Sequence, residues 1–267
     1  MNLALCSLAS GSSGNSYVIY SDEGSLLIDA GISAKQICEG LSKLGLSAED
    51  LNAVLVTHEH SDHIKGLAVL SKKTKACLYG TEATLECIGD EVLFQKHPIE
   101  AGESFMVADM EVRSFAVSHD AADPVGYSVS CSGSVISVVT DTGVVNGKIL
   151  ETMAESDILV LESNHDESIL RVGRYPWFLK QRILGEKGHL SNDSAAKALA
   201  AVLKRERNEG RLGKRQVLLA HLSKENNFPE MALATMENIL EEEGVATGND
   251  VRVEVLSRSQ ISPIYSV

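Results

Sequence analysis

The chain carries the stretch Ala53-Val54-Leu55-Val56-Thr57-His58-Glu59-His60-Ser61-Asp62-His63. Its first four residues are apolar, which is typical of a short buried strand. Three histidines and one aspartate follow within six residues, and imidazole and carboxylate are ligands for Zn, Mn and Fe. In an extended turn that leaves the strand, His58 and His60 point to one side while Asp62 and His63 reach a second centre. The stretch therefore predicts a two-metal site for hydrolysis.

Three further polar residues each follow a predicted strand. His119 comes after residues 112–117, Asp141 after 135–139 and His221 after 217–220. Strand ends are rigid and aim side chains at a common point. A lone histidine in such a place is usually structural, but three such residues beside the histidine cluster favour a metal role.

The composition indicates a folded chain without a membrane anchor. With 267 residues and 44% hydrophobic content, it can bury a large core, and we expect one domain over residues 1–267. No apolar run approaches the roughly 18–20 residues of a membrane span, and the start lacks the basic region of a signal peptide. Five scattered cysteines without a C-x-x-C pair indicate free thiols in a reducing cytoplasm.

The charge distribution bears on the partner. A net charge of −13 opposes binding to nucleic acid, because phosphate contacts need Lys and Arg. Residues 171–224, however, hold thirteen Lys or Arg and only four acidic residues. This basic sector could hold a polyanion, or its residues could be only solvated helix faces.

The order of expected elements is strands first, then alternating helices and strands. This rhythm predicts an α/β fold of two mixed β-sheets packed face to face with helices outside. We expect strands at residues 3–8, 17–20, 26–28, 53–56, 76–79, 104–106, 110–117, 125–131, 135–139, 158–161, 217–220 and 251–255. We expect helices at residues 33–44, 66–71, 81–87, 147–155, 191–207 and 229–243.

These motifs, in this order, resemble the metallo-β-lactamase superfamily over nearly the whole chain. The resemblance implies an αββα sandwich with the site at one edge of the two sheets. It implies that Asp29, in Leu26-Leu27-Ile28-Asp29-Ala30-Gly31, orients ligand histidines. It implies two divalent metal ions, Zn or Mn with Fe as an alternative. The implied ligands of one metal are His58, His60 and His119, those of the other are Asp62, His63 and His221, and Asp141 bridges the two.

A second resemblance concerns the residues after Gly188. The segment Gly188-His189-Leu190-Ser191-Asn192-Asp193-Ser194-Ala195-Ala196 is similar to one in the tRNA 3′-processing nucleases of this superfamily. It implies that His189 donates a proton to the departing oxygen. Glu162 or His165, in Leu161-Glu162-Ser163-Asn164-His165-Asp166, could orient His189 in a relay. Asp62 completes the expected catalytic set, and His165 could equally be an extra ligand or structural.

The chain most resembles the YycJ/WalJ group of exonuclease-like members, related to the RNase Z branch. The resemblance rests on the segments Leu8-Ala9-Ser10-Gly11-Ser12-Ser13-Gly14-Asn15-Ser16, His119-Asp120-Ala121, Glu162 to Asp166 and Gly188 to Ser191. It implies a cytoplasmic 5′→3′ exonuclease on double-stranded DNA, with DNA favoured over RNA and no membrane partner. The alternatives are hydrolysis of a small ester, thioester or cyclic phosphodiester, and an RNase Z-like RNA endonuclease. The oligomeric state stays open, a homodimer included.

Two segments have open roles. The loop with Ser12, Ser13 and Asn15 could hold a substrate phosphate through its N–H groups, or only connect two strands. Residues 168–187 are the best candidate for a substrate-facing lid. Their aromatic residues, Tyr175, Trp177 and Phe178, could stack a base or belong to the core.

Overall fold

A computed structural model describes residues 3–210, 215–245, 247–248 and 251–267. Arg211 and Lys214 of the basic sector lie outside the described residues. The contacts divide the chain into two compact units. Unit 1 comprises Met1–Ala116, Ala121–Val135 and Ser257–Val267, and unit 2 comprises Val117–Asp120 and Ile136–Leu256.

Unit 1 contains a seven-stranded mixed sheet in the order β14-β1-β2-β3-β4-β5-β6. Neighbouring strands from β14 to β3 pair antiparallel, and those from β3 to β6 pair parallel. The bounds are β1 Ala4–Ala9, β2 Ser16–Tyr20, β3 Ser25–Ile28, β4 Ala53–Leu55, β5 Cys77–Thr81, β6 Gln95–Ile99 and β14 Tyr265–Ser266. The parallel part leaves the carboxyl ends of β3 and β4 at one edge, where the expected metal ligands begin.

Three further strands belong to unit 1: β7 Ser104–Val107, β8 Met110–Ala116 and β9 Val125–Cys131. They pair antiparallel in sequence order. The buried hydroxyl of Tyr127 in β9 donates to the carbonyl of Val56 at 2.9 Å. Val56 is the residue directly after β4, so this bond fixes the start of the histidine stretch.

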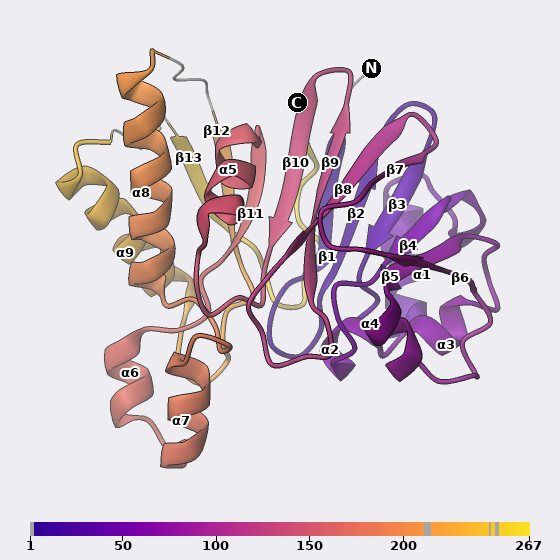
Figure 1. The fold of residues 1–267 in the computed structure, drawn as a ribbon, viewed down its shortest axis with the longest axis horizontal. Helices are drawn as coiled ribbons and strands as arrows, with labels where there is room; N and C mark the ends of the chain where they lie inside the picture. Colours follow the sequence, from indigo (N-terminus) through magenta and orange to yellow (C-terminus); the bar gives the residue numbers. More distant parts are fainter. Residues whose placement is uncertain (1–2, 211–214, 246, 249–250) are drawn as a thin grey trace. The chain divides into compact units, whose positions relative to one another are not determined.

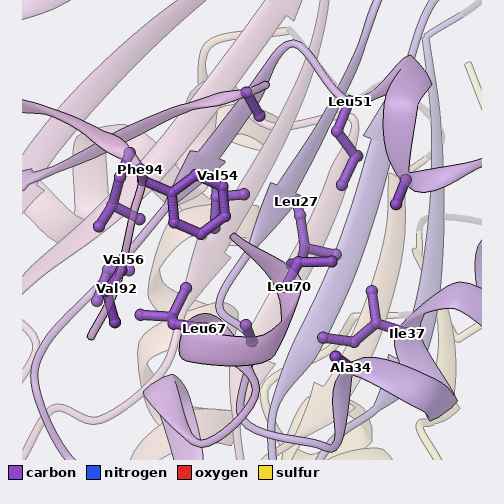
Figure 2. Packing of buried hydrophobic residues seen from close by; sticks show 14 of the residues in the cluster. Leu27, Ala34, Ile37, Leu51, Val54, Val56, Leu67, Leu70, Val92 and Phe94 are labelled. Carbon is purple, nitrogen blue, oxygen red and sulfur yellow. The ribbon is translucent and has the colours of Figure 1, made fainter. Parts of the chain in front are cut away.

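The helices of unit 1 cover one face of its large sheet. They are α1 Ala34–Lys43, η1 Ala48–Asp50, α2 Ser61–Ile64, α3 Leu67–Leu70 and α4 Glu82–Cys87. In Figure 2, Leu27 and Val54 from the sheet meet Ile37 of α1 and Leu70 of α3 in one apolar cluster. Burial of these side chains is the main stabilising contribution, since each fully buried large apolar side chain contributes about 1.5–3 kcal/mol.

Unit 2 contains parallel strands: β10 Ser134–Val139, which begins at the boundary with unit 1, β11 Ile158–Glu162, β12 Arg215–Ala220 and β13 Val251–Val255. Its helices are α5 Gly147–Glu155, α6 Glu167–Val172, α7 Trp177–Leu184, α8 Asn192–Asn208 and α9 Pro229–Glu242. Helix α8 packs against α5 and α9, and α9 against β13, whereas α6 and α7 form a separate pair (Figure 1). The pair α6–α7 connects β11 to α8.

The elements expected from the sequence are present, with bounds that differ by at most two residues. Six elements were not expected: η1, α2, α6, α7, β6 and β14. Each is short or amphipathic, and β6 includes His97, which stacks on Tyr79 with ring centroids 5.1 Å apart. Among the described residues, none of the helices has the length and apolar character needed to cross a membrane. All five cysteines are free thiols.

Candidate metal centre

The histidine stretch begins irregular and ends helical. His58 to His60 follow β4 without regular structure, and His60 is the N-cap of the one-turn helix α2. Asp62 and His63 therefore lie in a helix, and the prediction of an extended turn for them was wrong. The Asp62 carbonyl explains why the turn closes, because it accepts from the backbone N–H of Asn15 at 2.9 Å.

Asp29 is the centre of a buried hydrogen-bond network in unit 1. Its two carboxylate oxygens accept from the Thr57 N–H at 2.9 Å, the Thr57 hydroxyl at 2.9 Å and Nδ1 of His63 at 2.7 Å. Because the Thr57 hydroxyl donates to Asp29, its oxygen accepts from Nδ1 of His58 at 3.0 Å. One carboxylate thus orients two histidine rings.

The side chains of this stretch lie close together. The ring centroid of His58 is 4.6 Å from that of His60 and 4.1 Å from that of His63. The carboxylate of Asp62 lies 3.6 Å from Nε2 of His63, and its side chain is 24% exposed. Unit 1 therefore holds three imidazoles and one carboxylate in one place, with the His63 ring fully buried.

A second cluster lies in unit 2. Ligand atoms of Asp141, Glu162, His189 and His221 all lie within 4.8 Å of one another. Asp141 follows β10, Glu162 ends β11 and His221 follows β12, so parallel strands carry three of the four. His119 joins the same cluster, with Nε2 3.8 Å from the Asp141 carboxylate and its ring centroid 4.9 Å from that of His189.

Glu162 connects two histidines of this cluster. Its Oε1 accepts from Nδ1 of His189 at 2.7 Å and from Nδ1 of His221 at 3.1 Å, while Oε2 accepts from the N–H groups of Thr142 and Leu190. Burial alone would raise the pKa of Glu162, but His189 and His221 outweigh it and hold the pKa well below the usual range. Glu162 is therefore an anion in the folded chain.

His119 is held by the segment before His189. Its Nδ1 donates to the carbonyl of Gly188 at 3.1 Å. Burial lowers the pKa of His119, although the nearby Asp141 works in the opposite direction. Its neighbour Asp120 forms an ion pair with Arg182 of α7.

The same hydrogen-bond arrangement of histidine side chains occurs in both clusters. Four histidines donate through Nδ1 to an oxygen of the chain, which leaves the lone pair on Nε2. They are His58, His63, His119 and His221. Metal-ligating histidines are oriented in this way in proteins. Together with Asp62 and Asp141, these residues form an imidazole and carboxylate donor set that fits Zn, Mn or Fe.

Three residues of the clusters have a left-handed backbone. The φ angles are 59° at Asp29, 56° at Asp141 and 56° at His221. Residues other than glycine rarely adopt this region, and it costs roughly 1–2 kcal/mol. Asp29 and His221 follow a strand directly and Asp141 lies two residues after one, so the chain changes direction where these polar side chains leave the sheet edge.

The remaining predicted site residues have distinct environments. His165 is 1% exposed, neither ring nitrogen has a hydrogen-bond partner among the described residues, and burial lowers its pKa to about 4. His165 makes no hydrogen bond to His189 among the described residues. Of the two residues expected to orient His189, only Glu162 contacts it. Asn15 is buried, with its amide nitrogen 3.2 Å from Nε2 of His63. Ser12 and Ser13 are exposed.

Sequence reasoning missed two contributors. Thr57 connects Asp29 to His58, and the Gly188 carbonyl orients His119. Thr57 directly precedes the first histidine, which is a usable signal. A backbone carbonyl leaves no signal in the sequence. At Gly188, however, a Cβ would come within 2.1 Å of the Ile183 carbonyl oxygen, so a glycine is required there.

Comparisons with known proteins identify the family of the chain. A family profile described as "Beta-lactamase superfamily domain" matches residues 25–208. The chain is 40% identical over 252 residues to "Exodeoxyribonuclease YycJ" of Bacillus anthracis, covering 93% of each chain. It is also 40% identical over 266 residues to "Exodeoxyribonuclease WalJ" of Streptococcus pneumoniae (strain D39), covering 97% of this chain and 96% of the relative.

The fold resembles solved structures over its full length. The metallo-beta-lactamase fold protein YhfI from Bacillus subtilis matches with a TM-score of 0.73 and 14% identity, covering 100% of both chains. At this identity the likeness concerns the fold alone. It confirms the fold class expected from the sequence, with two mixed β-sheets flanked by helices.

Proposed function

Since the chain belongs to the beta-lactamase superfamily, we propose that it is a metal-dependent exodeoxyribonuclease of the YycJ/WalJ type. The observation that carries this proposal is 40% identity to two proteins of that name over at least 93% of each chain. Degradation from the 5′ end of double-stranded DNA is part of the proposal. The cytoplasm is the proposed location.

We propose that the chain binds two metal ions. His58, His60 and His119 would bind one ion, Asp62, His63 and His221 the other, and Asp141 both. The support is the donor set and the shared Nδ1 orientation of four of these histidines. When bound, Zn²⁺ or Mn²⁺ supplies Lewis-acid stabilisation of the phosphate oxygens and acidifies water.

His189 is proposed as the general acid. Its Nδ1 donates to Oε1 of Glu162 at 2.7 Å, which orients the ring and leaves Nε2 to face the leaving oxygen. The ring is 20% exposed, so a substrate can reach it. A leaving 3′- or 5′-alkoxide of DNA is strongly basic and needs this proton, whereas hydrolysis of a small ester needs it less. The pair His189–Glu162 therefore favours a phosphodiester substrate.

Purified protein stripped of metal and reloaded with Zn²⁺ or Mn²⁺ would test the proposal. Duplex DNA labelled at either 5′ or 3′ ends, RNA of the same sequence and a 4-nitrophenyl ester are compared. We expect mononucleotides released from the 5′ end of DNA, with a matched His97→Gln variant as active as the wild type, because His97 lies in β6 outside both clusters. Ester turnover without cleavage of nucleic acid would contradict the proposal.

A further inference from the structure

Two large aromatic side chains stand exposed on α7. Trp177 is 65% and Phe178 is 72% exposed, and both belong to the first turn of the helix. We call these two residues the aromatic tip. They do not belong to the core, one of the two roles that the sequence left open for them. Aromatic side chains bury 150–250 Å² each when packed, so exposure of two neighbours favours an external binding partner.

The aromatic tip is part of an ordered helix pair. Lys180 is only 8% exposed, and its ammonium donates to the Arg171 carbonyl at the end of α6 at 2.7 Å. Asp166 caps the start of α6 by accepting from the Ile169 N–H at 2.8 Å. The exposed rings are thus presented by fixed backbone.

The other end of α7 is connected directly to the proposed general acid. The His189 N–H donates to the Ile183 carbonyl in the last turn of α7 at 3.0 Å. A Cβ on Gly143, two residues after Asp141, would meet the Glu186 carbonyl oxygen at 2.3 Å, so the two segments lie in contact. Arg182 ties the same helix to Asp120 beside His119.

The length of α7 sets the spacing between Trp177 and Ile183, whose carbonyl binds the His189 N–H. The two residues are six positions apart, which is about 9 Å at the helical rise of 1.5 Å per residue. A stacked nucleic-acid strand advances about 3.4 Å per nucleotide. The length of α7 between Trp177 and Ile183 therefore corresponds to about three nucleotides of a stacked strand.

The charge of the helix pair α6–α7 indicates which kind of partner the aromatic tip binds. Residues 167–187 carry five basic side chains and two acidic ones, in a chain whose net charge is −13. Two copies of this basic surface would repel each other, which disfavours self-association through the tip. A nucleic-acid strand fits both features, because its phosphates are attracted to the basic side chains and its planar bases can stack on the exposed rings.

We propose that Trp177 and Phe178 form a stacking platform for the bases of the DNA strand, about three nucleotides from the cleaved bond. The inference rests on the proposed nuclease function. Stacking on the platform holds the strand while the exposed Arg174 neutralises a phosphate. Substrates shorter than about four nucleotides do not reach the platform and gain nothing from it.

Fluorescence gives a direct test, because Trp177 is the only tryptophan of the chain. A ten-nucleotide phosphorothioate strand, which resists hydrolysis, is titrated into the metal-loaded protein. We expect saturable quenching of the tryptophan emission by this strand and none by a dinucleotide. Binding of the strand by anisotropy without any change in emission would overturn the proposal.

Steady-state kinetics on a long and a small substrate distinguish a loss of base stacking from a folding defect. For Trp177→Ala/Phe178→Ala we expect kcat/KM on a ten-nucleotide substrate to fall about 5- to 100-fold, as loss of one or two stacked bases predicts. Turnover of bis(4-nitrophenyl) phosphate stays unchanged, and Trp177→Phe recovers most of the activity on DNA. Val172→Ala is the matched control, since Val172 is 87% exposed but not aromatic.

Three outcomes would overturn the platform. The double variant could degrade the ten-nucleotide strand as well as the wild type. It could lose turnover of bis(4-nitrophenyl) phosphate equally, which would show a structural role. It could change only the oligomeric state or binding to anionic vesicles. A wild type that cleaves neither DNA nor bis(4-nitrophenyl) phosphate would instead refute the proposed function.

Discussion

The carboxylate of Glu162 lies 2.7 Å from Nδ1 of His189, inside the protein, while the His189 ring is 20% exposed. The fully buried carboxylate holds the partly exposed imidazole in one orientation. The same oxygen accepts from His221 at 3.1 Å. A proposed metal ligand and the proposed acid are therefore positioned by one residue.

The first prediction concerns the leaving group. We expect His189→Ala to lower kcat on DNA about 10²- to 10⁴-fold, because the leaving alkoxide then receives no proton. A nucleotide 4-nitrophenyl ester should lose much less, since 4-nitrophenolate leaves without protonation. Steady-state kinetics on both substrates measure the difference. Equal losses on the two would exclude His189 as the general acid.

Glu162→Gln should behave differently from His189→Ala. Glutamine removes the anion that holds both His189 and His221, so we expect lower turnover on both substrates together with weaker metal binding. Metal content after dialysis distinguishes the two variants. Full metal content and unchanged turnover in Glu162→Gln would show that the carboxylate does not position these rings.

The second prediction concerns Asp29. Its carboxylate accepts from His63 and Thr57, so Asp29→Asn places an amide N–H against a donor and turns the His63 ring. We expect metal affinity to fall about 10- to 100-fold with the fold retained. Competition with a chromophoric chelator measures the affinity. Asp109→Asn is the control, because Asp109 pairs with Ser21 in unit 1 outside the histidine cluster.

The third prediction concerns Gly31, two residues after Asp29. A Cβ there would come within 1.7 Å of the Asp62 carbonyl oxygen, which belongs to α2. Backbone must move to accept it, so we expect Gly31→Ala to lower the thermal midpoint and the metal content together. Gly147→Ala is the matched control, because a Cβ at Gly147, the first residue of α5, meets nothing within 4 Å. Equal midpoints for the two variants would contradict the close approach.

The fourth prediction concerns His165 and pH. Burial lowers its pKa in the folded chain to about 4, against an ordinary value of 6.5. Between these values the unfolded chain binds a proton that the folded chain does not, so stability falls as the pH drops through this window. From pH 7.5 to 5.0 we expect the wild type to lose about 2 kcal/mol more than His165→Leu. Urea unfolding with chelator present measures this, and parallel pH profiles would refute it.

The sequence predicted the regular elements well because their signals are local. A continuous apolar run marks a buried strand such as β4, and the caps Ser33 and Asn146 mark where α1 and α5 begin. The helix α2 was missed because its four residues include two expected metal ligands and only one apolar residue, Ile64. Its shape depends on the hydrogen bond from Asn15, 47 residues away in the chain.

The site was predictable in its residue types but not in its supporting contacts. The roles of Asp141 and of the histidines as ligands stay predictions, and the structure adds how the rings are oriented. Asp29 and Thr57 are 28 residues apart, and their bond depends on β3 and β4 being neighbours. The exposure of Trp177 could not be predicted from the sequence either, because an aromatic residue gives the same sequence signal on the buried and on the exposed face of a helix.

The left-handed backbone at Asp29, Asp141 and His221 affects how variants there must be read. Asparagine adopts this conformation readily, whereas alanine has no side chain to support it and costs roughly 1–2 kcal/mol of folding free energy. The effect of an alanine variant at these three positions therefore has two causes, the loss of the polar side chain and the strain of the left-handed backbone. Asparagine at each position separates the two, and the difference between the alanine and asparagine variants is the energy that the protein stores in turning its backbone there.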